Sequence, residues 1–173
     1  VPMVSLPGDP KNALPLEELE ARTGGKVPID IAYGGSCTGS KRADMDFYAT
    51  VLGAASSRGE RVASGVRLFV QFGSGRVRRY ASEPGYLDVF ESVGARLLDP
   101  ACGACFNAGP GVSTNPNEVT ISAASRNFPG RSGPGRVYLA SPLVVAASAL
   151  AGHITAPSDS LFTSPHGRRG RAA

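Results

Sequence analysis

The stretch PIDIAYGGSCTGS, residues 28–40, holds the pattern around which the rest of the chain is organised. Residues 28–33 predict a short strand, because apolar side chains are followed directly by two glycines. Cys37 comes just after this glycine turn, and residues 42–55 then carry apolar side chains at helical spacing, with Ser40 as the expected N-cap. A helix N-terminus presents free backbone N–H groups, which suit an anionic thiolate at Cys37.

The same alternation of strands and helices continues along the chain. Further strands are predicted at residues 66–72, 95–98, 118–123 and 137–140. Helices are predicted from a Ser74 cap to Tyr80 and from Pro84 to a stop at Gly94. A last helix is predicted over residues 143–150, after a Ser141 cap and Pro142 and with its end at Gly152. This order predicts an α/β fold with a mostly parallel sheet flanked by helices.

A chain of 173 residues favours one folded domain. We expect an irregular N-terminal segment at residues 1–26 with a short helix within 12–23, an α/β domain at 27–155, and a disordered basic tail at 156–173. No apolar run is long enough to span a bilayer, and no secretory signal pattern opens the sequence. The expected location is cytoplasmic.

The charge pattern fits small anionic ligands at least as well as nucleic acid, for which it gives only weak support. The net charge is +4, and three arginines of the tail carry much of it. Aromatic side chains are few and do not alternate with the arginines, as they often do on nucleic-acid surfaces. We therefore expect no nucleic-acid partner and no membrane contact.

The chain has three cysteines, Cys37, Cys102 and Cys105, and each follows a predicted strand in a glycine-bearing loop. A CxxC pair with a remote third cysteine indicates metal binding or catalysis in a cytosolic protein. Structural zinc needs four protein ligands. The two histidines are poor fourth ligands, because His153 follows an apolar helix as an expected capping residue and His166 lies in the tail.

Three thiolates favour an iron–sulfur cluster with one iron left open, and a zinc site remains the alternative. A thioredoxin-like role is a second alternative. It would require the CxxC pair to open a helix, and the glycines and Pro110 after Cys105 do not favour one.

Five ordered motifs resemble the aconitase superfamily, which includes aconitase, homoaconitase and 3-isopropylmalate dehydratase. They are Gly35-Ser36-Cys37-Thr38, Gly73-Ser74, Cys102-Gly103-Ala104-Cys105, Arg126-Asn127-Phe128-Pro129-Gly130-Arg131, and Ala140-Ser141-Pro142 with a following alanine-rich helix and Gly152-His153. The resemblance runs from about residue 29 to residue 154. It covers what would be the cluster-bearing third domain of the large subunit.

The resemblance implies a 4Fe–4S cluster held by Cys37, Cys102 and Cys105. It implies a hydro-lyase that dehydrates and rehydrates a hydroxy di- or tricarboxylic acid such as citrate, homocitrate or isopropylmalate. Arg126 and Arg131 match family arginines that contact substrate, and planar guanidinium groups suit carboxylates. The implied partners are the remaining large-subunit domains and a swivel domain that resembles the small subunit.

Two positions depart from the family pattern. Gly39 and Ser125 stand where the family usually has asparagine, and Ser125 can still offer a hydroxyl to substrate. The family's catalytic base lies in another domain, so no catalytic residue is assigned in this chain. The alternatives are a non-catalytic module that binds a cluster or a carboxylate in a regulatory role and, ranked lower, a structural zinc domain.

Overall fold

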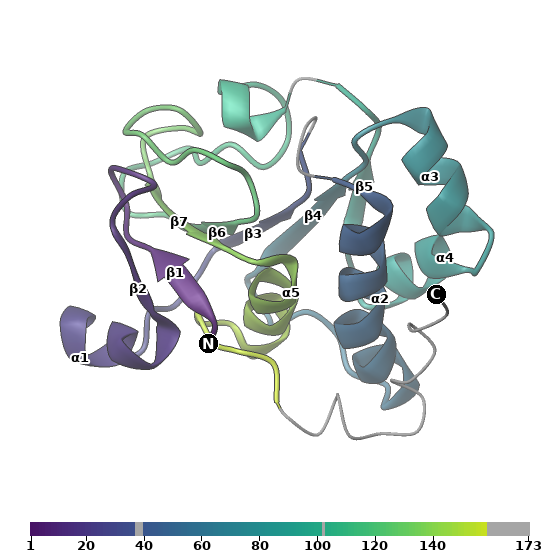
Figure 1. The fold of residues 1–173 in the computed structure, drawn as a ribbon, viewed down its shortest axis with the longest axis horizontal. Helices are drawn as coiled ribbons and strands as arrows, with labels where there is room; N and C mark the ends of the chain where they lie inside the picture. The colour runs from purple at the N-terminus through teal and green to yellow at the C-terminus, as the bar shows by residue number, and fades with distance from the viewer. Residues whose placement is uncertain (37–39, 102, 159–173) are drawn as a thin grey trace.

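The computed structural model describes residues 1–36, 40–101 and 103–158, so most of the predicted tail lies outside the described residues. Within these ranges the strands form one seven-stranded sheet in the order β2-β1-β7-β6-β3-β4-β5 (Figure 1). The strands are β1 (Met3–Ser5), β2 (Ala13–Pro15), β3 (Ile31–Gly34), β4 (Arg67–Gln71), β5 (Arg96–Leu98), β6 (Val119–Ser122) and β7 (Arg136–Ala140). Strands β3 to β7 pair in parallel, which confirms the predicted α/β class with a mostly parallel sheet.

The connection order creates a switch point in the middle of the sheet. The chain runs outward from β3 through β4 to β5, then returns to the other side of β3 as β6 and continues to β7. The loops that leave the carboxyl ends of β3 and β6 therefore lead in opposite directions. Open α/β sheets place ligands at such a point, because the diverging loops leave a crevice there.

The two faces of the sheet are covered differently. Helix α2 (Arg42–Ser57) contacts both α4 (Tyr86–Ser92) and α5 (Pro142–Ala151), and the three helices share the main core with Ala32, Leu68 and Val70 of the sheet. Alternate residues of the same strands, Ile31, Tyr33 and Phe69, form a smaller cluster with Ala104. Successive side chains on a strand point to opposite faces, so this cluster lies on the second face of the sheet. Ala104 belongs to the loop that follows β5, so that loop covers the second face.

Two of the expected helix caps are confirmed. The Ser74 hydroxyl accepts a hydrogen bond from the Val77 N–H at the start of α3 (Gly75–Ser82). The Ser141 hydroxyl likewise accepts from the Val144 N–H, and Pro142 occupies the first position of α5. These bonds satisfy N–H groups that have no partner within the helix.

Two other cap predictions were wrong. The N-cap of α2 is Lys41, whose N–H donates to the Asp44 carboxylate at 2.8 Å, and Ser40 bonds the sheet instead. The C-cap of α5 is Gly152, with φ of +83°, which confirms the predicted end of this helix but not the capping role expected for His153. Glycine adopts this left-handed conformation without strain, which explains why the cap falls on it.

The N-terminal segment is more regular than predicted. Residues 1–26 contain β1, β2, a 3₁₀ turn at Leu16–Glu18 and helix α1 (Leu19–Thr23), so the expected helix begins later and a strand takes its first part. Strand β1 pairs antiparallel with both β2 and β7. Strands of three residues are too short to show a clear alternation of apolar and polar side chains. They are stabilised by pairing at the edge of the sheet, next to β7. A 3₁₀ turn, η2 (Ala104–Phe106), also interrupts the loop predicted after Cys102.

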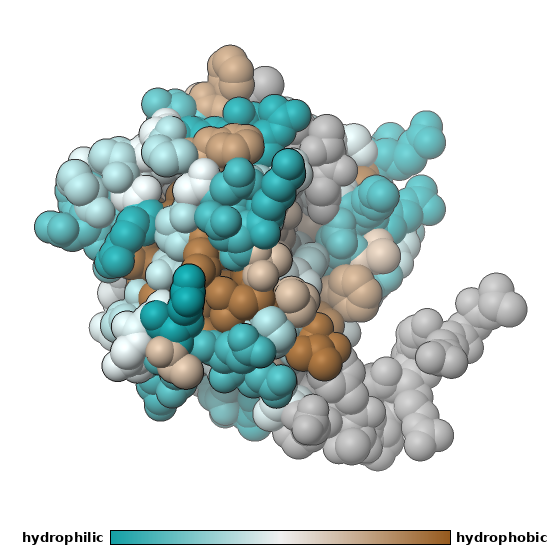
Figure 2. All heavy atoms as spheres, turned by 60° about the vertical axis from the view of Figure 1, so that its left-hand side comes forward, coloured by the Kyte–Doolittle hydropathy of each residue, from teal (hydrophilic) through white to brown (hydrophobic). Residues whose placement is uncertain are grey.

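The surface around the N-terminal strands is shown in Figure 2, which brings the β1–β2 side forward. It is mostly hydrophilic, with a smaller apolar area bordered by polar side chains. None of the helices in the described residues is long and apolar enough to cross a membrane.

Candidate functional site

The structure describes only one of the three cysteines, and that one only by its backbone. Cys37 and Cys102 lie outside the described residues, and Cys105 is placed only by its backbone, within η2. Thr38 and Gly39 also lie outside the described residues, so the described flanks are Ser36 before Cys37 and Ser40 three residues after it, and Ala101 and Gly103 on either side of Cys102. The positions of these neighbours show where each loop leaves the sheet.

The loop that carries Cys37 and the arginine loop begin side by side at the switch point. Tyr33 of β3 is in register with Ser122 of β6, and the next N–H, that of Ala123, donates to the Tyr33 carbonyl at 3.0 Å. After β6 the sequence continues into the arginine loop, Ser125 to Arg131. After β3 it continues toward Cys37. The sheet therefore brings together the starts of two loops that lie far apart in sequence.

Gln71, the last residue of β4, connects the two cysteine-bearing loops. Its backbone carbonyl accepts a hydrogen bond from the Ser40 hydroxyl at 2.8 Å. Its side-chain amide donates to the Ala101 carbonyl and accepts from the Tyr33 hydroxyl, each at 2.8 Å. The residue is only 2% exposed, so these are bonds within the protein interior. The prediction did not include Gln71, although a glutamine within an apolar strand was a usable signal.

Glycines allow these loops to approach the sheet closely. A Cβ atom at Gly103 would lie 2.5 Å from the Tyr33 hydroxyl and 2.8 Å from the Gln71 Oε1. One at Gly35 would collide with the Gln71 carbonyl, and one at Gly73 would lie 2.5 Å from the Ser40 carbonyl. Each loop thus lies against backbone or buried side chains where no larger residue fits.

The candidate residues of the arginine loop differ in their exposure to solvent. Ser125 and Arg126 are exposed, whereas Arg131 is half-buried. The Arg131 Nε atom is inaccessible to solvent and has no hydrogen-bond partner among the described residues. Buried donors are normally paired, so this atom is suited to an acceptor brought by a ligand.

Two residues outside the predicted set hold the arginine loop in place. The Asn127 amide donates to the Leu6 carbonyl at 2.8 Å and to the Val137 carbonyl at 3.0 Å. Ser113, in the loop after η2, bonds the Ser132 carbonyl through both its N–H and its hydroxyl, at 3.1 Å each. The loop after β5 is therefore bonded to the arginine loop after β6, and η2 and the arginine loop lie along the same edge of the sheet in Figure 1.

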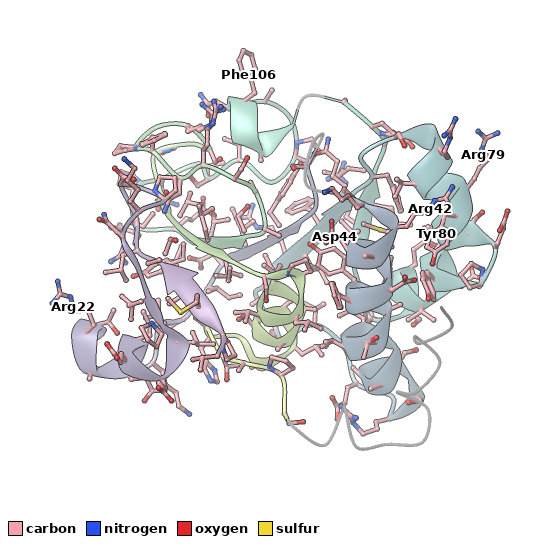
Figure 3. All side chains as sticks on the ribbon, viewed as in Figure 1. Arg22, Arg42, Asp44, Arg79, Tyr80 and Phe106 are labelled. Atoms are coloured by element: carbon pink, nitrogen blue, oxygen red, sulfur yellow. The ribbon has the colours of Figure 1, made fainter. Side chains whose placement is uncertain are left out.

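Two surface hollows in the described part of the chain lie away from these loops. One, of about 470 Å³, is lined by Arg42, Arg76, Arg79, Tyr80 and Glu83, and the Arg42 guanidinium lies 5.2 Å from the centre of the Tyr80 ring (Figure 3). The other, of about 270 Å³, lies beside α5 and includes Thr155. Neither hollow is lined by a cysteine or by a residue of the arginine loop, so the candidate site is defined by the loops.

No three described side chains of His, Cys, Asp or Glu come close enough together to hold a metal ion. This finding leaves the predicted ligand set open, because Cys37 and Cys102 fall outside the described ranges. Figure 3 shows Phe106, the neighbour of Cys105, pointing away from the body of the protein, and its side chain is 70% exposed.

Comparison with known proteins finds a family model and relatives that all belong to aconitase-type enzymes. The model of the aconitase family (aconitate hydratase) matches residues 1–152. The 3-isopropylmalate dehydratase large subunit of Mycolicibacterium smegmatis is 42% identical over 157 residues, which cover 89% of this chain and 35% of that protein. The mitochondrial homoaconitase of Mycosarcoma maydis is 42% identical over 161 residues, covering 92% of this chain and 21% of that protein.

The chain thus spans about a fifth to a third of the length of these curated relatives. The 3-isopropylmalate dehydratase large subunit of Clostridioides difficile, 36% identical over 158 residues, shows the same partial coverage at 35% of its length. The family match nevertheless takes in both cysteine-bearing loops and the arginine loop. The chain belongs to the aconitase family.

Proposed function

We propose that this chain is the cluster-bearing domain of an iron–sulfur hydro-lyase that acts on a hydroxy di- or tricarboxylic acid. The observation that carries the proposal is that Gln71 and Ser113 link three loops at one sheet edge through hydrogen bonds, since these loops hold all three cysteines and the two motif arginines. The relatives are named as dehydratases of isopropylmalate and as homoaconitases, which supports this substrate class.

The residues present fit a 4Fe–4S cluster held by Cys37, Cys102 and Cys105. Thiolates are the usual ligands of such clusters, and three of them leave one iron available. The described flanks of two of these cysteines, Ser40 and Ala101, are both bonded to Gln71, so their loops leave the sheet close together. The tight approach of Gly35 and Gly103 to the sheet provides a fixed base for the loops.

The arginine loop would bind the carboxylates of the substrate. When bound, the cluster would supply a Lewis-acidic iron for the substrate hydroxyl. Arg131 offers a buried Nε that lacks a partner among the described residues, and Arg126 offers an exposed guanidinium. A guanidinium can donate two parallel hydrogen bonds to one carboxylate, which fixes its orientation as well as its charge. Ser125 would add a short hydroxyl donor beside Arg126.

Turnover would require the rest of the enzyme. The chain matches only part of its relatives, and the general base is not assigned to any of its residues. We propose that the remaining large-subunit domains and a swivel domain complete the active site in the cytoplasm. The second candidate, a non-catalytic cluster- or carboxylate-binding module, is favoured by Gly39 and Ser125, because a glycine has no side chain and a serine reaches less far than asparagine.

Anaerobic reconstitution of the 173-residue chain with iron and sulfide tests the cluster. We expect a brown protein with iron and sulfide in near-equal amounts, and loss of the chromophore in Cys37→Ala and Cys102→Ala. Ser148→Ala, a change in α5 away from the loops, is the control for folding. A colourless protein that carries one zinc ion would overturn the proposal.

Mixing the reconstituted chain with the missing domains separates the two candidates. Hydration of an unsaturated di- or tricarboxylic acid by the mixture supports the hydro-lyase. Persistent inactivity with an intact cluster supports the non-catalytic module.

A further inference from the structure

Gln71 is an unusual residue for its position in the sheet. It ends a strand whose preceding residues Leu68, Phe69 and Val70 are all buried and apolar, and its own exposed fraction is 2%. Burying an amide without hydrogen bonds costs a few kcal/mol. An apolar side chain would avoid this cost, so hydrogen bonds within the protein must compensate for burying the amide.

The hydrogen bonds of Gln71 connect the two cysteine-bearing loops. The side chain bridges Tyr33, on the strand before the Cys37 loop, and Ala101, the residue before Cys102. The backbone carbonyl holds Ser40, three residues after Cys37. One residue therefore bonds the described flanks of both loops, and each bond has the length of a well-formed hydrogen bond.

The packing around Gln71 leaves little freedom for these loops to shift. Gly103 lies so close that an added Cβ would meet both the Gln71 amide and the Tyr33 hydroxyl. Gly35 approaches the Gln71 carbonyl from the Cys37 side. Hydrogen bonds in such a water-excluded network reinforce one another, so the separation of the loops is fixed by this residue more than by either loop alone.

We propose that Gln71 is a positioning residue that sets the separation of the two cysteine-bearing loops and so determines how firmly the iron–sulfur cluster is retained. This inference rests on the proposed function, and it assigns to Gln71 no contact with the cluster or the substrate. Residues that orient metal ligands from outside the ligand set typically change metal affinity by about 10- to 100-fold when they are replaced. An effect of that size on cluster retention is expected here.

The test compares Gln71→Met, which keeps the length of the side chain without its amide, with Ser148→Ala. Ser148 is a matched control, because it is fully buried and makes two hydrogen bonds to Thr155 in another part of the fold. Each variant of the whole chain is reconstituted anaerobically, and its iron and sulfide content, its visible absorbance on exposure to air and its apoprotein Tm are measured. We expect the Gln71→Met cluster to decay about tenfold faster than that of the wild type.

The Ser148→Ala cluster should decay at the wild-type rate even where its Tm falls as far as that of Gln71→Met. Equal decay in wild type and Gln71→Met overturns the inference, and so does faster decay in both variants in proportion to their loss of Tm. If Gln71→Met does not fold, Ser40→Ala takes its place, because it removes only the bond from the Cys37 loop to the Gln71 carbonyl.

Failure of the proposed function and failure of the role of Gln71 give different results. A wild-type chain that takes up no iron and sulfide overturns the proposed function and this inference together. A wild-type chain with a stable cluster, matched by an equally stable cluster in Gln71→Met and Ser40→Ala, overturns only the role of Gln71.

Discussion

The Tyr48 hydroxyl of helix α2 accepts a hydrogen bond from the backbone N–H of Gly35 at 2.9 Å. Tyr48 is fully buried, and burial raises the pKa of its hydroxyl well above the ordinary value for tyrosine. The ring also lies against Gly34, where an added Cβ would be 2.8 Å from it. Helix α2 thus fixes the start of the Cys37 loop from one side while β4 fixes it from the other.

Tyr48→Phe should destabilise the protein, because it leaves the Gly35 N–H buried without an acceptor. A buried unsatisfied group costs about 1–3 kcal/mol, and we expect the free energy of unfolding in urea to fall by about this amount. Tyr138→Phe is the control, since the Tyr138 hydroxyl makes no hydrogen bond to a described residue. Equal losses in the two variants would show that the Gly35 bond contributes nothing.

Gly35→Ala should be more damaging than Gly59→Ala. Both glycines have positive φ, +84° and +71°, so both substitutions carry backbone strain of about 1 kcal/mol. Only at Gly35 would the new methyl group collide with the Gln71 carbonyl, whereas Gly59 has open space. We expect thermal unfolding to show a clearly larger drop in Tm for Gly35→Ala, and a similar drop for both would argue against the close contact with β4.

Stability should fall at alkaline pH in part through Tyr86. Burial, with a hydrogen bond of 2.9 Å to Asp46, raises the pKa of its hydroxyl from 10.0 to about 12. The folded state therefore keeps a proton that the unfolded chain releases, so this contribution is present below pH 10 and is lost as the pH rises through about 12. Urea unfolding at pH 9 and 11 should show a smaller pH-dependent loss for Tyr86→Phe than for the wild type. Identical losses would contradict the pKa shift.

Asn127→Ala should loosen the arginine loop. The change removes the donors to the Leu6 and Val137 carbonyls, which is expected to cost about 1–3 kcal/mol of stability. Hydrogen exchange of the amides in residues 125–131 should then speed up. Asn115→Ala, which removes a hydrogen bond within an exposed turn, is the control and should leave exchange in this loop unchanged.

Arg131→Gln should weaken substrate binding in the reassembled enzyme. Loss of a charge-assisted hydrogen bond costs about 1.5–3 kcal/mol, so KM for the hydroxy acid should rise by roughly 10- to 100-fold. Arg22→Gln, on helix α1 far along the chain from the loop, controls for the general effect of losing a positive charge (Figure 3). An unchanged KM for Arg131→Gln would remove this residue from the substrate site.

The sequence predicted the parallel sheet well, because buried parallel strands leave mostly apolar runs, such as residues 66–72, which here lie between two glycines. It also predicted the Ser74 and Ser141 caps, since a cap is a local interaction between a side chain and an N–H three residues away. It was wrong at Ser40 for the opposite reason: that hydroxyl bonds Gln71, thirty-one residues away, and no local pattern reveals this.

The candidate site divides in the same way. The sequence by itself determined which residue types are available, three cysteines and a loop with two arginines, and the family to which they belong. Only the tertiary structure decided that β3 lies between β4 and β6, so that the loops after these strands meet at one edge. It also decided that Gln71, Asn127 and Ser113 hold the loops together. Strand order and buried hydrogen bonds depend on contacts between residues distant in sequence, and these contacts form only when the whole sheet closes over its core.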